Sequence, residues 1–180
     1  MIEKTLKVLM LEDLDTDREL IKRSVLKMIP NAIFIMASSK AEFEEKIKWG
    51  NPDLILADHN IPGYNGLEAL LLVREKISHV PFIFVTGSLN DEERVAETIL
   101  NGASGYILKN NLNALPAKIL EVMGDAESRF QKRQDEVNKL RRKQILIQKL
   151  QALVTNAPEF EQKQEALEIL EEITDITGII

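Results

Sequence analysis

Acidic residues follow directly on an apolar run near the start of the chain. The stretch LMLEDLDTD, residues 9–17, contains four of them: Glu12, Asp13, Asp15 and Asp17. The three aspartates have the spacing of the first ligands of an EF-hand calcium loop, which also needs glycine at its sixth position and glutamate at its twelfth. This chain has Arg18 and Ser24 there. The pattern therefore argues against an EF-hand, and the acids need another explanation.

Three more polar side chains stand directly after later apolar runs. Asp58 follows LILA, Thr86 follows FIFV and Lys109 follows YIL. Carboxylates that cluster repel one another unless a cation lies among them. Mg²⁺ suits such a cluster, because it takes one or two carboxylates, keeps several waters and leaves a position for a phosphoryl oxygen. Lys109 and Thr86 could then give a positive charge and a hydrogen bond to the same phosphoryl group.

Five apolar runs rich in Val, Ile and Phe predict the strands that would carry these side chains. They cover residues 7–11, 32–36, 54–57, 82–85 and 106–108. Since polar and apolar residues do not alternate in them, we expect strands buried on both faces. The stretches between them carry helix signals: a cap at Asp15 or Thr16 before a helix toward Ile29, a capping box at Ser39 and Glu42 before a helix ending near Gly50, a helix over 67–77, and a helix from a cap at Asn90 to Asn101, closed by Gly102.

This alternation of strand and helix predicts a doubly wound α/β fold with a five-stranded parallel sheet over residues 1–125. In such sheets, ligands bind outside the carboxyl ends of the strands. The polar residues that follow the strands should therefore meet at one edge of the sheet: Glu12, Asp13, Asp58, Thr86 and Lys109.

Three segments resemble the signature regions of response-regulator receiver domains, the phosphoacceptors of two-component phosphorelay systems. They are DLILADHNIPGYNG (residues 53–66), FVTG around Thr86, and GASGYILK, which ends in Lys109. The resemblance covers the domain predicted over residues 1–125. It implies a flavodoxin-like sheet with strand order 2-1-3-4-5. It also implies a phosphoacceptor switch, not an enzyme beyond self-catalysed phosphotransfer and dephosphorylation.

The resemblance implies a role for each residue at this edge. Asp58 would accept a phosphoryl group from a histidine kinase or a phosphotransfer protein. Thr86 and Lys109 would hold the phosphoryl oxygens, and Tyr106 would turn inward as Thr86 moves. The added charge would then reshape the face near the last strand and relay the change to an attached or partner module.

A metal site is implied as well, with two departures from the family pattern nearby. Mg²⁺ or Mn²⁺ would be bound directly by Asp13, through water by Glu12, and by Asp58 and the backbone carbonyl of Asn60. Glu12 replaces the more common aspartate, which lengthens one arm of the site and keeps its charge. Asn110 stands where proline is frequent in the family, which leaves the shape of that loop open.

A long helix is predicted from Asn113 to about Val154, with residues 126–154 forming a coiled-coil signalling helix. Two sets of apolar residues recur every seven positions: Phe130 and Val137, then Leu140, Ile147 and Val154. This spacing favours a parallel homodimer over a solvated helix with scattered apolar residues. The lysines and arginines of this stretch are better explained by a solvated face than by a nucleic-acid site.

The predicted last segment, residues 155–180, begins with a helix break at TNAPEF. An amphipathic helix should follow, with one apolar face made by Leu167, Leu170, Ile173 and Ile176. Its EILEEITDITG resembles the first helix of a GAF sensory domain. Two interpretations stay open: a fragment of a longer signalling protein with a downstream sensor or output module, or a complete protein whose last helix packs back on the dimer.

Composition excludes several other classes of function. The 180 residues have a net charge of -6 and no cysteine, and they lack a run of roughly 20 apolar residues. This argues against a general nucleic-acid binder and a membrane span, and favours a cytoplasmic protein. Two alternatives to the switch are a dimerisation scaffold with an unused receiver site and a Mg²⁺-dependent phosphohydrolase that forms an aspartyl phosphate. The hydrolase would need a second acid where Asn60 stands.

Overall fold

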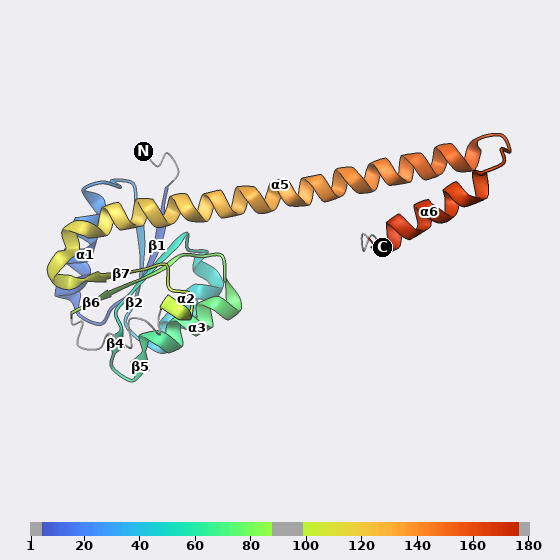
Figure 1. The fold of residues 1–180 in the computed structure, drawn as a ribbon. Helices are drawn as coiled ribbons and strands as arrows, with labels where there is room; N and C mark the ends of the chain where they lie inside the picture. The colour runs from blue at the N-terminus through green and yellow to red at the C-terminus, as the bar shows by residue number, and fades with distance from the viewer. Residues whose placement is uncertain (1–4, 88–98, 177–180) are drawn as a thin grey trace. The chain divides into compact units, whose positions relative to one another are not determined.

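The computed structural model describes residues 5–87 and 99–176. Its main sheet has five parallel strands in the order β2-β1-β3-β6-β7: β1 (Lys7–Leu11), β2 (Ile33–Ala37), β3 (Leu54–Ala57), β6 (Phe82–Thr86) and β7 (Gly105–Leu108) (Figure 1). A short antiparallel pair, β4 (Asn60–Ile61) and β5 (Tyr64–Asn65), follows β3. Counted along the chain, the five parallel strands have the order 2-1-3-4-5. The predicted doubly wound fold is therefore confirmed.

The prediction that the strands are buried on both faces is confirmed for the three central strands and wrong for the two edge strands. All residues of β3 and β6 are buried, and in β1 only Lys7 is exposed. By contrast, β2 and β7 each have one neighbour in the sheet, and most of their residues are partly exposed. Local sequence could not separate these cases, because the position of a strand in the sheet is set by the whole topology.

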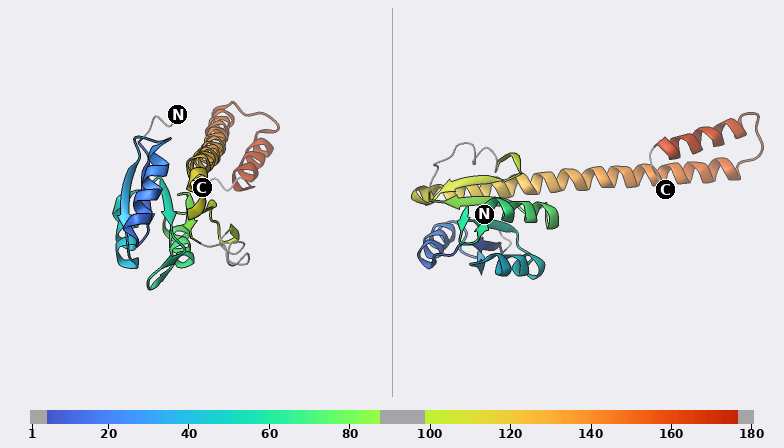
Figure 2. Two further views of the ribbon diagram at one scale, coloured as in Figure 1. Left: turned by 90° about the vertical axis from the view of Figure 1, so that its left-hand side faces the viewer. Right: turned by 90° about the horizontal axis from the view of Figure 1, so that it is seen from below.

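Helices cover both faces of the sheet (Figure 2). On one face lie α1 (Asp15–Leu26) and the first turns of α5 (Leu115–Asn156), packed through Ile21, Val25, Leu115, Ile119 and Val122. On the other lie α2 (Lys40–Gly50) and α3 (Gly66–Lys76), packed through Phe43, Ile47, Leu70 and Val73. Neighbouring strand residues such as Val8 and Leu9 point to opposite cores. Each fully buried apolar side chain contributes about 1.5–3 kcal/mol of transfer free energy, which fixes the strand ends in place.

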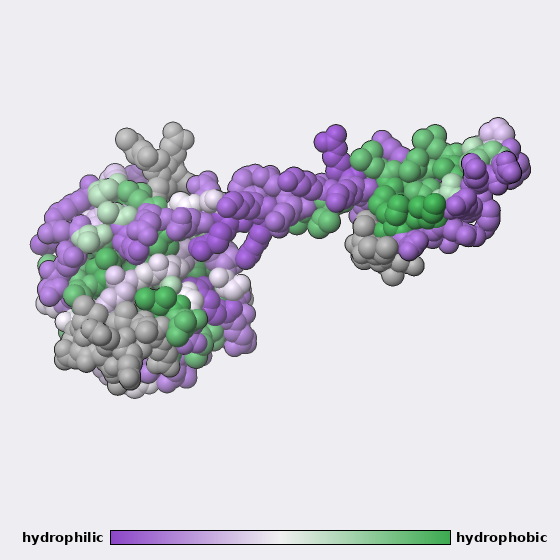
Figure 3. Space-filling model, viewed as in Figure 1, coloured by the Kyte–Doolittle hydropathy of each residue, from purple (hydrophilic) through white to green (hydrophobic). Residues whose placement is uncertain are grey.

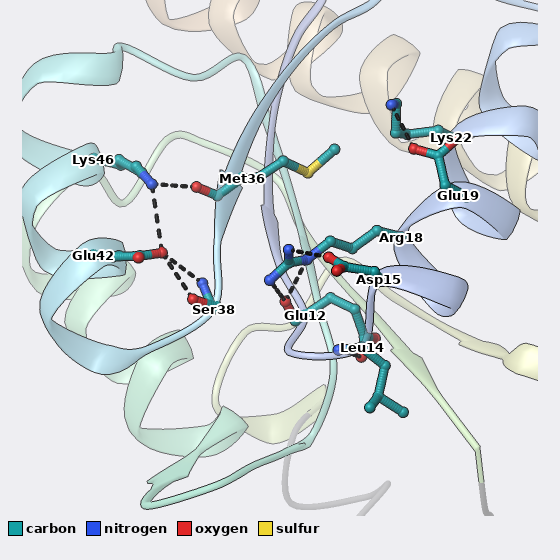
Figure 4. Close-up of polar contacts among 10 residues, drawn as sticks. All are labelled: Glu12, Leu14, Asp15, Arg18, Glu19, Lys22, Met36, Ser38, Glu42 and Lys46. Atoms are coloured by element: carbon teal, nitrogen blue, oxygen red, sulfur yellow. Dashed lines mark hydrogen bonds and ion pairs between the residues drawn. The ribbon is translucent and has the colours of Figure 1, made fainter.

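Two helix starts follow from capping side chains. Ser39 Oγ accepts a hydrogen bond from the Glu42 N–H (3.4 Å), as the capping box predicts. The Glu42 carboxylate accepts from the N–H of Ser38 (2.8 Å) instead of that of Ser39 (Figure 4). At the start of α3, Asn65 Oδ1 accepts from the N–H of Leu67 (2.9 Å).

The start of α1 differs from the prediction. Leu14 occupies the N-cap position and has no capping side chain of its own. Its N–H instead donates to Glu12 Oε1 (3.2 Å). The Asp15 carboxylate is paired with Arg18 Nη1 at 2.7 Å, so it does not cap the helix (Figure 4). The predicted cap at Asp15 or Thr16 is therefore wrong.

The helix predicted from Asn90 lies for the most part outside the described residues. At its predicted end, Gly102 has φ +93°, and its N–H donates to the carbonyl of Ile99 (2.9 Å). After β7, residues Lys109–Ala114 form a 3₁₀ helix, so α5 begins at Leu115, slightly later than predicted. Every peptide bond in the described ranges is trans, including the one before Asn110.

The chain divides into two compact units, residues 1–127 and 128–180, and α5 crosses from the first to the second. In the second unit, α6 (Lys163–Ile176) lies antiparallel beside the end of α5 (Figures 1 and 2). Gln151 Nε2 donates to Thr174 Oγ1 (3.3 Å), and Leu170 is buried. On α5, one row of residues is half-buried: Gln144, Ile147, Gln151 and Val154. The later half of the predicted coiled-coil seam thus faces α6 of the same chain.

Among residues 5–87 and 99–176, no helix is both long enough and apolar enough to cross a membrane.

Candidate functional site

The carboxyl ends of four strands bring their polar residues to one edge of the sheet. Glu12 follows β1, Asp58 follows β3, Thr86 ends β6 and Lys109 follows β7. Glu12, Asp58 and Thr86 are buried. The N–H of Asp58 donates to the carbonyl of Leu11 (2.9 Å), which ties the residue after β3 to the end of β1. The predicted convergence of these four residues is present in the structure.

Lys109 lies at the centre of three carboxylates. Its Nζ is 2.7 Å from Glu12 Oε2, 2.6 Å from Asp17 Oδ2 and 2.6 Å from Asp58 Oδ2. Burial alone would lower the pKa of Lys109, but its hydrogen bonds to Asp17 and Asp58 and its close pairing with Glu12 outweigh burial and raise that pKa. The lysine is therefore a fixed positive charge that holds three negative groups together.

Glu12 is the most buried member of this cluster. Burial raises its pKa, while the pairing with Lys109 and the hydrogen bond from the Leu14 N–H act in the opposite direction. Glu12 Oε2 lies close to Lys109 Nζ but has no hydrogen bond of acceptable geometry. A buried carboxylate oxygen with only an electrostatic partner is able to accept a further ligand.

The donor atoms at this edge fit a hard divalent cation. The Glu12 oxygen has no hydrogen bond. Asp13 also has neither a hydrogen bond nor an ion pair with the described residues. Within residues 5–87 and 99–176, no three acidic or histidine side chains converge closely enough to hold an ion by themselves. Mg²⁺ does not require three, because one or two carboxylates, a backbone carbonyl and waters complete its octahedron. Glu12, Asp13, Asp58 and the carbonyl of Asn60 could supply such a set.

Gly66 fixes the position of Asp58 from the far side. Its N–H donates to the carbonyl of His59 (2.9 Å). A Cβ at this position would lie 2.8 Å from the Asp58 carbonyl oxygen, from His59 Cα and from the Phe84 ring. Only glycine lets the start of α3 approach the strand end this closely, so the residue types around Asp58 follow from space as well as from chemistry.

Thr86 and Tyr106 form a second pair at the same edge. The Tyr106 hydroxyl shares a hydrogen bond with the Thr86 side chain. Burial raises the pKa of Tyr106, and this hydrogen bond acts in the opposite direction. A movement of either side chain therefore has to break or remake a contact with the other.

Comparison with known proteins gives the family of the chain. A family model described as the response regulator receiver domain matches residues 8–120. The chain belongs to this family. The structure also resembles the CheY-like receiver domain protein of Methanospirillum hungatei, with a TM-score of 0.63 and 24% identity over 70% of this chain and 99% of that one. The phosphorylated cyanobacterial phytochrome response regulator RcpA gives a TM-score of 0.55 at 23% identity, over 69% of this chain and 93% of that one. These two likenesses concern the fold.

Curated relatives match the chain over different shares of their own length. The nitrate/nitrite response regulator NarL of Escherichia coli K12 is 38% identical over 89 residues, which are 49% of this chain and 41% of NarL. The chemotaxis protein CheY-3 of Vibrio cholerae is 27% identical over 110 residues, 60% of this chain and 83% of CheY-3. The matched part of the chain thus spans less than half of the length of NarL and most of that of CheY-3.

Two residues of this receiver site were not predicted. Asp17 supplies the third carboxylate on Lys109. Arg18 donates from Nε (2.8 Å) and Nη2 (2.6 Å) to the backbone carbonyl of Glu12 and from Nη1 to Asp15 (Figure 4). Both lie in the first turn of α1, which returns them to the end of β1. The signal was in the sequence: an acid and a base five and six residues after Glu12 fall on that turn once the helix start is known.

Proposed function

We propose that this receiver accepts a phosphoryl group on Asp58 from the phosphohistidine of a histidine kinase or phosphotransfer protein. The observation that carries the proposal is the contact of Asp58 Oδ2 with Lys109 Nζ (2.6 Å) beside Glu12 and Asp17. The family membership of residues 8–120 supports it, because receivers of two-component systems are phosphoacceptors. For each site residue that was predicted from the sequence, we propose the role that the family resemblance implies.

The chemistry follows from the charges at the strand ends. One Asp58 carboxylate oxygen attacks phosphorus, the P–N bond to the histidine breaks, and the imidazole nitrogen keeps the bonding pair. The dianionic product gains hydrogen bonds from Lys109, which is already within reach of Asp58, and from Thr86. Glu12, Asp13, Asp58 and the Asn60 carbonyl would hold Mg²⁺ or Mn²⁺. When bound, that ion supplies positive charge to the phosphoryl oxygens.

The switch that follows involves the pair at the end of β6. When Thr86 turns toward the phosphoryl oxygens, it gives up its present hydrogen bond with Tyr106, and the aromatic ring follows inward. Lys109 simultaneously leaves part of its contact with Asp17 and Glu12. These movements redistribute the packing between β7 and α5, which begins six residues after Lys109.

The remainder of the chain would carry this change onward. We assign residues 1–125 to the receiver, 126–154 to a signalling helix and 155–180 to an amphipathic segment. The helices would pair two copies of the chain and pass the change to an attached or partner module. The support is the continuity of α5 from the receiver core into the second unit.

The test is intact mass after incubation with a small acyl-phosphate donor, with and without Mg²⁺. We expect the wild type to gain one phosphoryl group only when Mg²⁺ is present, and Asp58→Asn to gain none. Asp15→Asn is the matched control, because Asp15 is an exposed acid at the start of α1, outside the Lys109 cluster. It should be phosphorylated like the wild type. No gain by the wild type would favour a dimerisation scaffold with an unused site.

A further inference from the structure

The helical hairpin formed by α5 and α6 has a second apolar row besides the one inside it. Inside, half-buried Ile147 and Val154 of α5 face α6, where Leu170 is buried. Outside, exposed apolar side chains remain on both helices: Leu146, Leu150 and Leu153 on α5, and Ile169 and Ile173 on α6. The hairpin thus satisfies one face of each helix and leaves another in water, where apolar side chains are unfavourable.

The outer rows of the two helices lie on the same side of the hairpin. Leu146, Leu150 and Leu153 are four and three residues apart, so they form one stripe along α5. On α6, Ile169 and Ile173 are four residues apart. Both stripes are rotated about a third of a turn from the inner contact, and in antiparallel helices this rotation brings them to one side. In Figure 3, apolar surface of the two helices merges into one patch over the hairpin. A patch of this kind marks an interaction site.

The charges of the hairpin are self-complementary. Residues 143–156, the part of α5 that carries the patch, contain two bases, Lys143 and Lys149, and no acid. On α6 the charges are reversed, with Lys163 as its single base and glutamates at 165, 168, 171 and 172. In two hairpins related by a twofold axis, each basic α5 lies beside the acidic α6 of the other copy. A second copy therefore matches both the apolar patch and the charges around it.

We propose that this patch is covered by a second copy of the chain, so that two α5–α6 hairpins form a four-helix bundle. The inference deepens the proposed pairing through the C-terminal helices by naming the faces that meet. In a two-stranded coiled coil, Ile147 and Val154 would lie between the two copies. Here they lie between helices of one chain, and Leu146, Leu150, Ile169 and Ile173 lie between the copies.

The experiment is sedimentation equilibrium of the full, unphosphorylated chain and of three single variants. Leu146→Glu and Ile169→Glu place a charge in the patch on α5 and α6 respectively. Leu140→Glu is the matched control: Leu140 is on the same helix and 56% exposed against 57% for Leu146, but it lies on the predicted coiled-coil seam. Far-UV circular dichroism checks that each variant keeps its helix content.

We expect a dimer for the wild type and for Leu140→Glu, and a dissociation constant raised by about tenfold or more for both patch variants. A wild type that stays monomeric at high concentration would overturn the proposal. So would a dimer that is lost in Leu140→Glu and kept in Leu146→Glu, which would assign the contact to a two-stranded coiled coil. An unaffected Ile169→Glu would remove α6 from the interface and with it the four-helix bundle. None of these outcomes depends on phosphorylation of Asp58.

Discussion

At the scale of single residues, the site is a balance of charge around Lys109. Three carboxylates meet one ammonium at 2.6–2.7 Å, and the most buried of them, Glu12, keeps an oxygen without a hydrogen bond. The cluster therefore holds more negative charge than it can neutralise itself. A bound divalent cation, or the movement of one carboxylate away from the cluster, would relieve this excess of negative charge. A chemical change at Asp58 can therefore affect several residues at once.

The first prediction removes the central charge. Lys109→Met leaves Glu12 buried without its partner, so we expect a loss of about 3 kcal/mol of stability at neutral pH. Burial, which raises the pKa of Glu12, is then less opposed. A raised carboxyl pKa means stability that is present at low pH and lost as the pH rises, so the deficit should shrink on acidification. Urea unfolding at several pH values, with and without Mg²⁺, measures this.

Mg²⁺ provides the control for this variant. It should stabilise Lys109→Met more than the wild type, since the ion replaces part of the lost positive charge. Equal stabilisation of both proteins would contradict the proposed donor set.

The second prediction concerns Tyr64, a buried residue of β5. Burial raises the pKa of Tyr64 to about 12, with smaller effects from Glu44 and Glu68. The folded state thus disfavours the phenolate, and stability should be lost as the pH rises from about 10 through about 12. The loss amounts to about 2 kcal/mol. Tyr64→Phe should not show this loss of stability. Unfolding curves of both proteins at pH 8 and pH 11 would then show a decline in stability for the wild type alone.

At the scale of elements, the sequence predicted most of what positions the site. Continuous apolar runs located all five strands within a residue or so, and the capping box located α2. The start of α1 escaped prediction because Arg18 draws Asp15 away, which is a side-chain contact and not a local propensity. Asp17 was missed for the same reason. Its role on Lys109 joins residues 92 positions apart and depends on the packing of α1 against the strand ends.

The third prediction tests how closely α3 approaches the phosphoacceptor. Gly66→Ala would place a Cβ at 2.8 Å from the Asp58 carbonyl oxygen and from His59 Cα. Backbone atoms cannot yield as a flexible side chain does, so we expect about 1–3 kcal/mol of destabilisation and slower phosphorylation of Asp58. Thermal unfolding and acyl-phosphate kinetics report the two effects.

Gly124→Ala is the matched control for that change. Gly124 lies inside α5 with nothing within 4 Å of an added Cβ. Alanine should stabilise the protein there by about 0.5–1 kcal/mol and leave phosphorylation unchanged. If Gly66→Ala behaved like Gly124→Ala, the close approach would not be what holds Asp58.

At the scale of the whole molecule, the two units share a helix but not a core. The receiver core takes only the beginning of α5, through Leu115, Ile119 and Val122. The second unit has its own apolar contacts between α5 and α6. The sequence predicted a long helix and, after the break at TNAPEF, a later amphipathic one, and both are present. Spacing alone could not reveal that α6 covers part of the seam, because that contact depends on the direction of the turn between the helices.

The last prediction follows from this division of α5. A chain ending at Glu127 keeps Leu115, Ile119 and Val122 and loses the whole hairpin. It should fold, accept a phosphoryl group at the wild-type rate and sediment as a monomer. A chain ending at Lys118 loses two fully buried side chains, each worth about 2–5 kcal/mol when truncated in a core, and should be largely unfolded. Circular dichroism, intact mass and sedimentation distinguish the two truncations. A dimeric 1–127 chain would move the main interface into the receiver itself and leave the hairpin patch to another partner.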